Sequence, residues 1–247
     1  MVAQAQRLVH ESKFSYADFK NNFPYQGDSL FSLIFERNKD KIKLSKEKFA
    51  VKNLRKIFDA TFHLSPKIGF QAMSLRDLST EAGLSMGGLY SSISSKDAIA
   101  IIVKDVVSVI CAEVVEESRE QTDPKLALEV LMRGYLYAST LMQPWFYFLY
   151  FETRSLPHDE QEESINIELT QISELENLIG KLAHQDSSAC HKSEFVATMA
   201  LSLIQERYLK HWKYQKAVET VDAYADKCLQ LIYRAICVDE IQPCNRS

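Results

Sequence analysis

The chain has 247 residues, of which 46% are hydrophobic and 25% charged, and its formal net charge is −4 at pH 7. No apolar run approaches the ~20 residues of a membrane-spanning helix, and the N-terminus lacks a basic-then-apolar signal pattern; we therefore expect a cytoplasmic protein without a membrane anchor. The five cysteines are scattered and odd in number, which favours reduced thiols over a disulfide framework.

Helices are expected along almost the whole chain. There are 7 glycines and 6 prolines, and no segment sustains the alternation of a half-buried strand, so the sequence predicts an all-α fold. Residues 1–43 form an extension in which aromatic side chains are too frequent for a disordered tail. We expect a helix at 29–42 that packs on the body or on a partner subunit.

The first long helix is predicted at 46–65, where Leu54, Ile57 and Phe58 lie near one face. Pro66 disfavours helical geometry at the residue before it, so the helix should end or tighten there. Lysines cluster just before and inside its first turn. They either contact phosphate or form a solvated basic face: Lys39, Lys41, Lys43, Lys46 and Lys48.

Two short helices, 75–82 and 86–92, are predicted next, joined by a tight turn. Ser74 is a good N-cap for the first, and Gly83 falls where a left-handed residue would end it. Ser85 can cap the second. A helix, a short turn with glycine and a second helix is the plan of the DNA-binding helix-turn-helix.

Residues from about 52 to 102 resemble the N-terminal domain of the TetR family of bacterial transcriptional regulators. The family's pattern is matched without a gap by Ile57, Ala60, Leu64, Gly69, Phe70, Ser74, Leu75, Arg76, Asp77, Leu78, Ala82, Gly83, Leu84, Ser85, Gly87, Leu89, Tyr90, Ser95, Lys96 and Asp97. The resemblance implies a three-helix DNA-binding domain at 44–100, preceded by the extension and followed by a larger helical ligand-binding and dimerisation domain at 101–240.

Charge supports the same division. Between residues 41 and 105 there are 11 Lys and Arg against 6 Asp and Glu, whereas 106–247 carry 13 against 22. A basic module on an acidic body is typical of a phosphate-binding domain attached to one that does not bind DNA.

Base reading is expected from the second short helix and phosphate binding from its surroundings. Lys96 begins a helix, where its ammonium and the helix N-terminus both favour a phosphate, and the resemblance implies that the Tyr90 hydroxyl reaches the DNA backbone. Ser92 is a further candidate reader. The expected DNA-binding residues are Ser74, Arg76, Ser85, Met86, Gly87, Gly88, Tyr90, Ser91 and Lys96. This reading face is poor in bidentate side chains, so we expect DNA shape to contribute to recognition.

The remaining elements follow from periodicity and proline positions. Helices are predicted at 96–120, 124–141, 144–154, 165–184, 193–213 and 216–237, with loops at 156–164 and 184–192. The last two helices are amphipathic. The resemblance implies that they pair with their copies in a homodimer, which would also read two half-sites at once; alternatively, their apolar stripes are buried within their own domain.

The run 144–151 is aromatic on every side and must be covered on every side, either by the core or by a bound molecule. In the family the second domain binds a small effector. A weak similarity to acyl-CoA-responsive members implies an acyl-type or other large apolar ligand. Arg154 would meet an anionic head group or form an internal ion pair. The expected ligand-binding residues are Leu131, Tyr135, Met142, Trp145, Phe148, Phe151, Arg154, Tyr208 and Trp212.

Other functions are weighed against this one. An enzyme is not favoured, because no nucleophile elbow, phosphate-binding loop or metal-spaced His/Cys cluster occurs, and no metal or cofactor is expected. The closer alternative is a helical ligand-binding dimer that has lost sequence-specific DNA binding. The favoured function is a DNA-binding regulator, a repressor, which binds operator DNA as a homodimer and is released by a small apolar effector.

Overall fold

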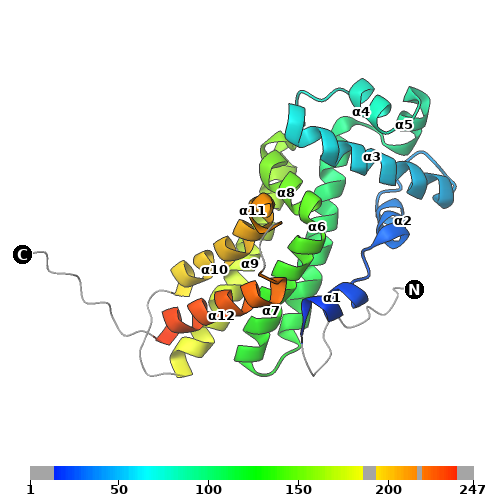
Figure 1. The fold of residues 1–247 in the computed structure, drawn as a ribbon. Helices are drawn as coiled ribbons and strands as arrows, with labels where there is room; N and C mark the ends of the chain where they lie inside the picture. The colour runs from blue at the N-terminus through cyan, green and yellow to red at the C-terminus, as the bar shows by residue number, and fades with distance from the viewer. Residues whose placement is uncertain (1–13, 186–192, 216–218, 238–247) are drawn as a thin grey trace, which may run out of the picture. The chain divides into compact units, whose positions relative to one another are not determined.

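The computed structural model describes residues 14–185, 193–215 and 219–237, and within them every regular element is helical (Figure 1). The prediction of an all-α fold is confirmed. The elements in chain order are α1 (Tyr16–Asn22), α2 (Gly27–Arg37), α3 (Glu47–Ile68), α4 (Leu75–Glu81), α5 (Met86–Ser92), α6 (Lys96–Arg119), α7 (Pro124–Leu141), α8 (Gln143–Glu152), a 3-10 turn (Thr153–Ser155), α9 (His158–Gln185), α10 (Ser193–Leu209), α11 (His211–Tyr214) and α12 (Val221–Cys237).

Two units divide the described chain. The first contains Asn22–Ile110 and Met142–Asn166, and the second contains Cys111–Leu141 with the described parts of 14–21 and 167–237. The division falls inside α6 and inside α9, because each of these long helices contributes one end to each unit. Among the described helices, none is both long enough and apolar enough to cross a membrane.

The first unit is centred on α3, whose buried face includes Leu54, Ile57 and Phe58. The helix was expected to end or tighten at residue 65, but it continues through Pro66 to Ile68. Proline lacks an N–H, so the hydrogen bond to the carbonyl four residues earlier is lost, and the ring also crowds that carbonyl. Because Pro66 lies in the last turn, only two helical residues follow this interruption. Gly69, with φ 79°, then ends the helix by donating its N–H to the Ser65 carbonyl.

The predicted loop at 156–164 is wrong, because α9 begins at His158. The Gln161 N–H donates to the Pro157 carbonyl. The acidic residues that suggested a loop lie in the first turns, where their negative charge interacts favourably with the helix dipole. Glu160 and Glu163 also pair with Lys104 on α6, whose side chain is largely buried. A tertiary ion-pair network thus stabilises a helix start that the local sequence did not indicate.

Three other boundaries differ from the prediction. The helix expected at 144–154 becomes a 3-10 turn after Glu152. The helix expected at 193–213 ends at Leu209 and restarts as the four-residue α11, and the last described helix begins at Val221, five residues after its expected start. Residues 186–192, most of the expected loop at 184–192, lie outside the described residues.

The extension contains two helices where one was expected at 29–42. α2 packs in the first unit and ends at Arg37, which donates to both carboxylate oxygens of Asp105 on α6. α1 belongs to the second unit, where Phe19 lies against the ring of Tyr137 on α7. Most aromatic residues of the described extension are buried, which agrees with the expectation that it is not a disordered tail.

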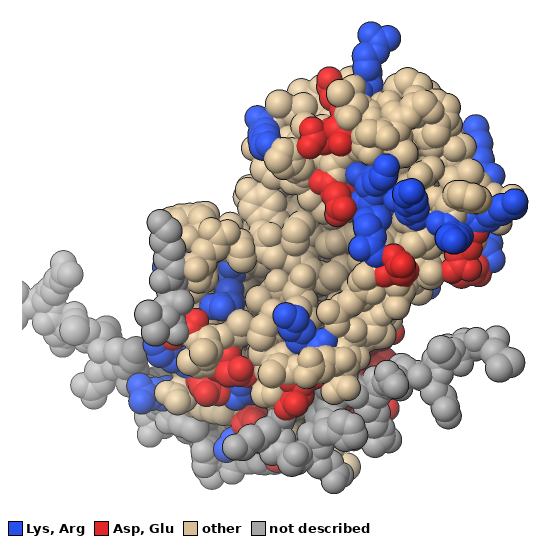
Figure 2. All heavy atoms as spheres, turned by 45° about the vertical axis from the view of Figure 1, so that its right-hand side comes forward, with Lys and Arg blue, Asp and Glu red and all other residues tan. Residues whose placement is uncertain are grey.

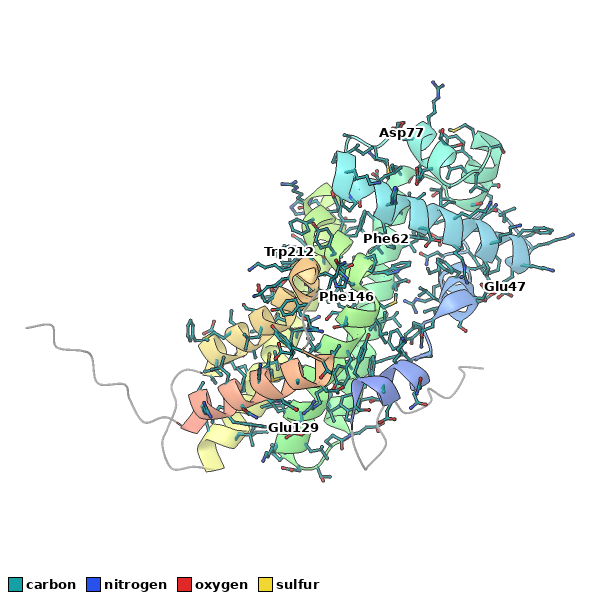
Figure 3. The ribbon with its side chains drawn as sticks, in the orientation of Figure 1. Glu47, Phe62, Asp77, Glu129, Phe146 and Trp212 are labelled. Carbon is teal, nitrogen blue, oxygen red and sulfur yellow. The ribbon has the colours of Figure 1, made fainter. Side chains whose placement is uncertain are left out.

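Helix α7 is the centre of the second unit, because most of its residues are buried. Gly134 is required for a close approach: a Cβ built there would lie 2.6 Å from Cγ1 of Val114 on α6. Tyr233 on α12 donates its hydroxyl to Oε1 of Glu129 on α7, at 3.1 Å (Glu129 is labelled in Figure 3). α10 and α12 also pack on α7 and on each other.

Candidate functional site

The helix-turn-helix is formed by α4, α5 and the turn between them. Ser74 and Asp77 make a reciprocal capping box at the start of α4, at 3.1 Å from the Asp77 N–H to Ser74 Oγ and 2.9 Å from the Ser74 N–H to Asp77 Oδ2. The Ser74 hydroxyl lowers the pKa of the Asp77 carboxyl. Gly83, with φ 60°, ends the helix as the sequence predicted.

The second helix, α5, is held to the unit at both ends. Its cap is Ser85 Oγ, which accepts the Gly88 N–H at 3.1 Å. At its C-terminal end the Ser91 carbonyl accepts the N–H groups of Lys43 and Leu44. These contacts fix α5 against the segment that leads from α2 to α3.

The inward face of α5 is set by Leu89 and Ser92, which are both buried. Ser92 Oγ donates to the Gly88 carbonyl at 2.7 Å and accepts from Asn53 on α3 at 3.0 Å. Ser92 is therefore unavailable to read bases, and the prediction of a reading role for it is wrong for this state. The reason is a tertiary contact: the hydrogen bond from Asn53 on α3 holds the Ser92 side chain inward.

The other candidate DNA-binding residues reach solvent to different degrees. Tyr90 is 45% exposed, and the half-buried Ser91 donates its hydroxyl to the Gly88 carbonyl at 2.9 Å, which leaves its oxygen as an acceptor. The solvent-facing residues of the helix pair include Ser74, Arg76, Ser85 and Gly87, with Met86 and Gly88 half-buried. Both helices therefore present exposed residues to solvent.

Lys96 has a role that the sequence did not indicate. Its Nζ donates to the carbonyls of Phe70, Gln71 and Met73, at 3.1, 2.8 and 3.2 Å. It also lies 5.2 Å from the centroid of the Phe70 ring. The ammonium thus closes the turn between α3 and α4 and sets the position of the first helix of the pair, using the three donors that phosphate binding would need.

The lysines beside this helix pair differ in whether they form ion pairs. Lys39 pairs with Glu36 and Lys41 with Asp40, whereas among the described residues no carboxylate forms an ion pair with the exposed lysines of the α3 start, which are Lys43, Lys46, Lys48 and Lys52. Figure 2 shows Lys and Arg side chains gathered on this unit. Unpaired ammonium groups are what phosphate contacts require.

Two adjacent glycines make α5 a weak helix, and one of them can be replaced without a clash. A Cβ at Gly87 would lie 4.0 Å from Ser85 Oγ, whereas at Gly88 it would lie 3.3 Å from the same capping oxygen. We expect Gly87→Ala to raise the free energy of unfolding by about 0.5–1 kcal/mol through helix propensity, measured by urea denaturation. Gly88→Ala is the matched control and should gain less; equal gains would contradict this account of the cap.

The aromatic run on α8 is only partly core. Trp145 stacks on Phe58 with ring centroids 4.9 Å apart, and Phe62, labelled in Figure 3, lies 4.9 Å from Trp145 and 5.8 Å from Phe148. Met142 is buried as well. Phe151, by contrast, is 46% exposed, and Arg154 is also exposed. The run therefore divides into a buried face and a solvent-facing one.

The second unit contains the other expected ligand-binding residues. Leu131, Tyr135 and Tyr208 are buried, whereas Trp212 on α11 (Figure 3) is 71% exposed and lines no enclosed space. Tyr135 is distinctive: its hydroxyl is buried and has no hydrogen-bond partner within the described chain. Burial raises the pKa of this hydroxyl, so it remains a donor.

Two polar residues near Tyr135 were missed by sequence reasoning. Cys111 on α6 is buried and accepts a hydrogen bond from Gln171 Nε2 on α9 at 3.0 Å. Burial raises the pKa of the Cys111 thiol to about 12, so this thiol is protonated and unreactive. The sequence carries one signal for these two residues, which is that each is a polar residue within an apolar stripe of its helix. The unsatisfied Tyr135 hydroxyl can donate to a carbonyl or ester oxygen of a molecule bound in this core. No group of three or more His, Cys, Asp or Glu in the described residues is placed to hold a metal ion.

These features define an all-α protein with a capped helix-turn-helix and a second helical unit. Solved structures with this fold include the TetR-family regulator PfmR from Thermus thermophilus, with 21% identity, a TM-score of 0.63 and coverage of 72% of this chain and 97% of the other. AibR in complex with isovaleryl coenzyme A and operator DNA is 16% identical, with a TM-score of 0.62 and coverage of 72% of this chain and 97% of the other. FadR from Bacillus subtilis in complex with stearoyl-CoA is 15% identical, with a TM-score of 0.54 and coverage of 72% of this chain and 97% of the other.

No protein-family model matches the chain. No curated protein sequence matches it significantly. The chain has the fold of TetR-family transcriptional regulators, as the motif resemblance implied.

Proposed function

We propose that the protein is a ligand-responsive transcriptional regulator, a repressor, which binds operator DNA as a homodimer in the cytoplasm and is released by a small apolar effector. The observation that carries the proposal is the capped helix pair, whose exposed face includes Arg76, Met86 and Tyr90 and adjoins lysines that have no described carboxylate partner. Structural neighbours bound to operator DNA and to acyl-CoA support it.

Homodimerisation is supported by apolar side chains left in solvent on the last helices. On α10 Phe195 is 64% exposed, and Met199 is exposed four residues further along the same helix. On α12 Leu231 is exposed in the same way. Large exposed apolar side chains at helical spacing favour burial against a second copy, and a two-fold dimer would present two copies of α5 to two half-sites.

The effector is proposed to enter the core around Tyr135. A buried donor without a hydrogen-bond partner costs free energy, and the carbonyl of a bound acyl group would remove that cost by accepting the hydrogen bond. The hydrocarbon tail of the acyl group would bury apolar surface at the same time. Release of DNA then requires that the effector bind one conformation of the protein better than the other.

The experiment is a fluorescence-anisotropy titration of the protein with DNA from upstream of its own gene, against a scrambled duplex, at several salt concentrations. We expect two subunits per site, and affinity that falls with salt. Arg76→Ala should weaken binding and reduce the salt slope by about one. Lys181→Ala on α9, an exposed lysine of the second unit, is the control and should change neither.

Acyl-CoAs of increasing length, from isovaleryl to stearoyl, are then added to the complex. Release of DNA by one length class, abolished in Tyr135→Phe, supports the proposed effector. Binding that never distinguishes the two duplexes would instead favour the second candidate, a ligand-binding dimer of this fold without an operator. The observation in favour of that candidate is the reading face, where Gly87, Gly88 and Ser91 present little side chain.

A further inference from the structure

Arg207 occupies a position where an apolar side chain is expected. On α10 the buried stripe runs through Ala197, Ala200 and Ile204, and Arg207 is the next residue at helical spacing. Only 7% of Arg207 is exposed. A guanidinium is always charged, and such groups are buried in proteins when they are paired.

No partner for this charge occurs in the part of the chain that the structure describes. Nη1 of Arg207 is buried and has no hydrogen-bond partner, and no described carboxylate forms an ion pair with the guanidinium. Two tyrosine rings lie beside it instead: the guanidinium carbon is 4.9 Å from the ring centroid of Tyr214 on α11 and 5.2 Å from that of Tyr224 on α12. The face of an aromatic ring attracts a cation. It does not replace the strong hydrogen bonds that the N–H groups of a guanidinium donate to a carboxylate.

The acidic groups nearest in the fold are committed to other residues. Glu206, next in sequence, pairs with Lys210 and Lys213. Glu219 pairs with Lys227. Neither carboxylate forms an ion pair with Arg207 in the described part of the chain.

Asp222 on α12 forms no ion pair with Arg207 among the described residues and binds neutral donors instead. Its Oδ1 accepts the Tyr137 hydroxyl at 2.6 Å and the Tyr16 N–H at 2.8 Å. Two further groups near Arg207 are Tyr224 and Cys228: Tyr224 donates its hydroxyl to the Leu203 carbonyl, and burial raises the pKa of the Cys228 thiol to about 11. The Cys228 thiol is therefore protonated at neutral pH and does not pair with the guanidinium.

We propose that Arg207, between Tyr214 and Tyr224, is the anchor of a binding site for a small monovalent carboxylate. A carboxylate matches the planar fork of the guanidinium, and one negative charge neutralises the single buried positive charge. A phosphate dianion would leave a net charge in a dry site, which is costly. The aromatic walls favour a carboxylate on an apolar or aromatic body.

Access to the site is given by α11. This helix has four residues, His211–Tyr214, so few backbone hydrogen bonds hold Tyr214 beside the guanidinium. A movement of α11 would carry the Tyr214 ring away from the guanidinium. Binding at this site does not depend on DNA binding, so it is measurable even if the proposed regulatory function fails.

The test is isothermal titration calorimetry and thermal unfolding of the full chain without DNA. The probes are acetate, hexanoate and benzoate, each compared with its neutral amide, and inorganic phosphate. We expect saturable binding and a raised unfolding temperature with hexanoate or benzoate, and neither with the amides or phosphate. Arg207→Met should weaken binding at least about tenfold, because a hydrogen-bonded charge pair is lost, while the free protein unfolds at a higher temperature than the wild type. Arg234→Met, at an exposed arginine of α12, should bind as the wild type does.

Three results would overturn the proposal: no saturable binding of any carboxylate, equal binding by Arg207→Met, or phosphate binding more tightly than hexanoate and benzoate. The variant Glu219→Gln distinguishes the proposed site from one alternative, in which Arg207 forms an internal ion pair with Glu219 in solution. If that pair formed, Glu219→Gln and Arg207→Met would both lower the unfolding temperature and the wild type would bind no carboxylate. If the site is as proposed, Glu219→Gln retains carboxylate binding.

Discussion

Replacing Trp145 by alanine is expected to lower the free energy of unfolding by about 3–5 kcal/mol, the usual range for truncating a large buried aromatic side chain. Trp145 is buried where α8 meets α3 and α2: its ring stacks on Phe58, meets Phe62 edge-on and lies 6.4 Å from Phe31. The cavity left by the indole would be lined by three rings that belong to two helices of the first unit, α2 and α3, so they cannot all collapse into it.

Urea denaturation followed by circular dichroism measures this loss. Phe151→Ala is the matched control, because Phe151 lies on the same helix with half of its side chain in solvent, and its truncation should cost far less. Trp145→Phe should recover most of the stability by keeping an aromatic ring in the stack. Similar losses for Trp145→Ala and Phe151→Ala would show that α8 is not held through Trp145, and would favour a ligand as the cover of this face.

Tyr137→Ala is expected to be about as destabilising, by about 3–5 kcal/mol. Tyr137 is fully buried on α7, and its ring contacts Phe14, Tyr16 and Phe19 of the extension with centroids 5.4 to 5.6 Å away. Its hydroxyl lies 2.6 Å from Asp222 Oδ1, which also accepts the Tyr16 N–H. One side chain therefore connects α1, α7 and α12.

Tyr137→Phe separates the two contributions. It keeps the ring and leaves Asp222 and Arg133 with one partner fewer, so a smaller loss of about 1–3 kcal/mol is expected. Hydrogen exchange gives a second, local measurement: amides of 16–22 should lose protection in Tyr137→Ala while those of 47–68 keep theirs at low denaturant. Unchanged protection at 16–22 would contradict the anchoring of α1 through Tyr137.

Much of the helix-turn-helix could be predicted because its signals are local. The helix boundaries at 75 and 86–92 were predicted closely, since the cap at Ser74, the left-handed Gly83 and the cap at Ser85 all act over three or four residues. The same is true of α7, which begins at Pro124 and ends at Leu141 as expected. Such ends are favoured by hydrogen bonds between residues that are close in sequence.

Errors occurred where a partner distant in sequence decides. The start of α9 depends on Lys104, more than fifty residues earlier, and no local pattern carries that information. Ser92 was grouped with the reading face although Asn53 holds it inward. Lys96 was assigned to phosphate, yet three carbonyls of the preceding turn accept its ammonium. The sequence pattern did not single out Arg207, because its burial without an ion-pair partner among the described residues becomes visible only in three dimensions.

The sequence alone determined that the protein is all-helical, that a helix-turn-helix lies at 75–92, and that its reading face is short of side chains, because composition, periodicity and capping are properties of neighbouring residues. Only the tertiary structure decided how the extension is used and which of the candidate residues are free. It also decided that Tyr135 and Arg207 are buried with no hydrogen-bond partner among the described residues for Oη and Nη1, respectively. The physical reason is that burial and pairing join residues far apart in the chain, and a polar group acquires or lacks a partner only when those residues meet.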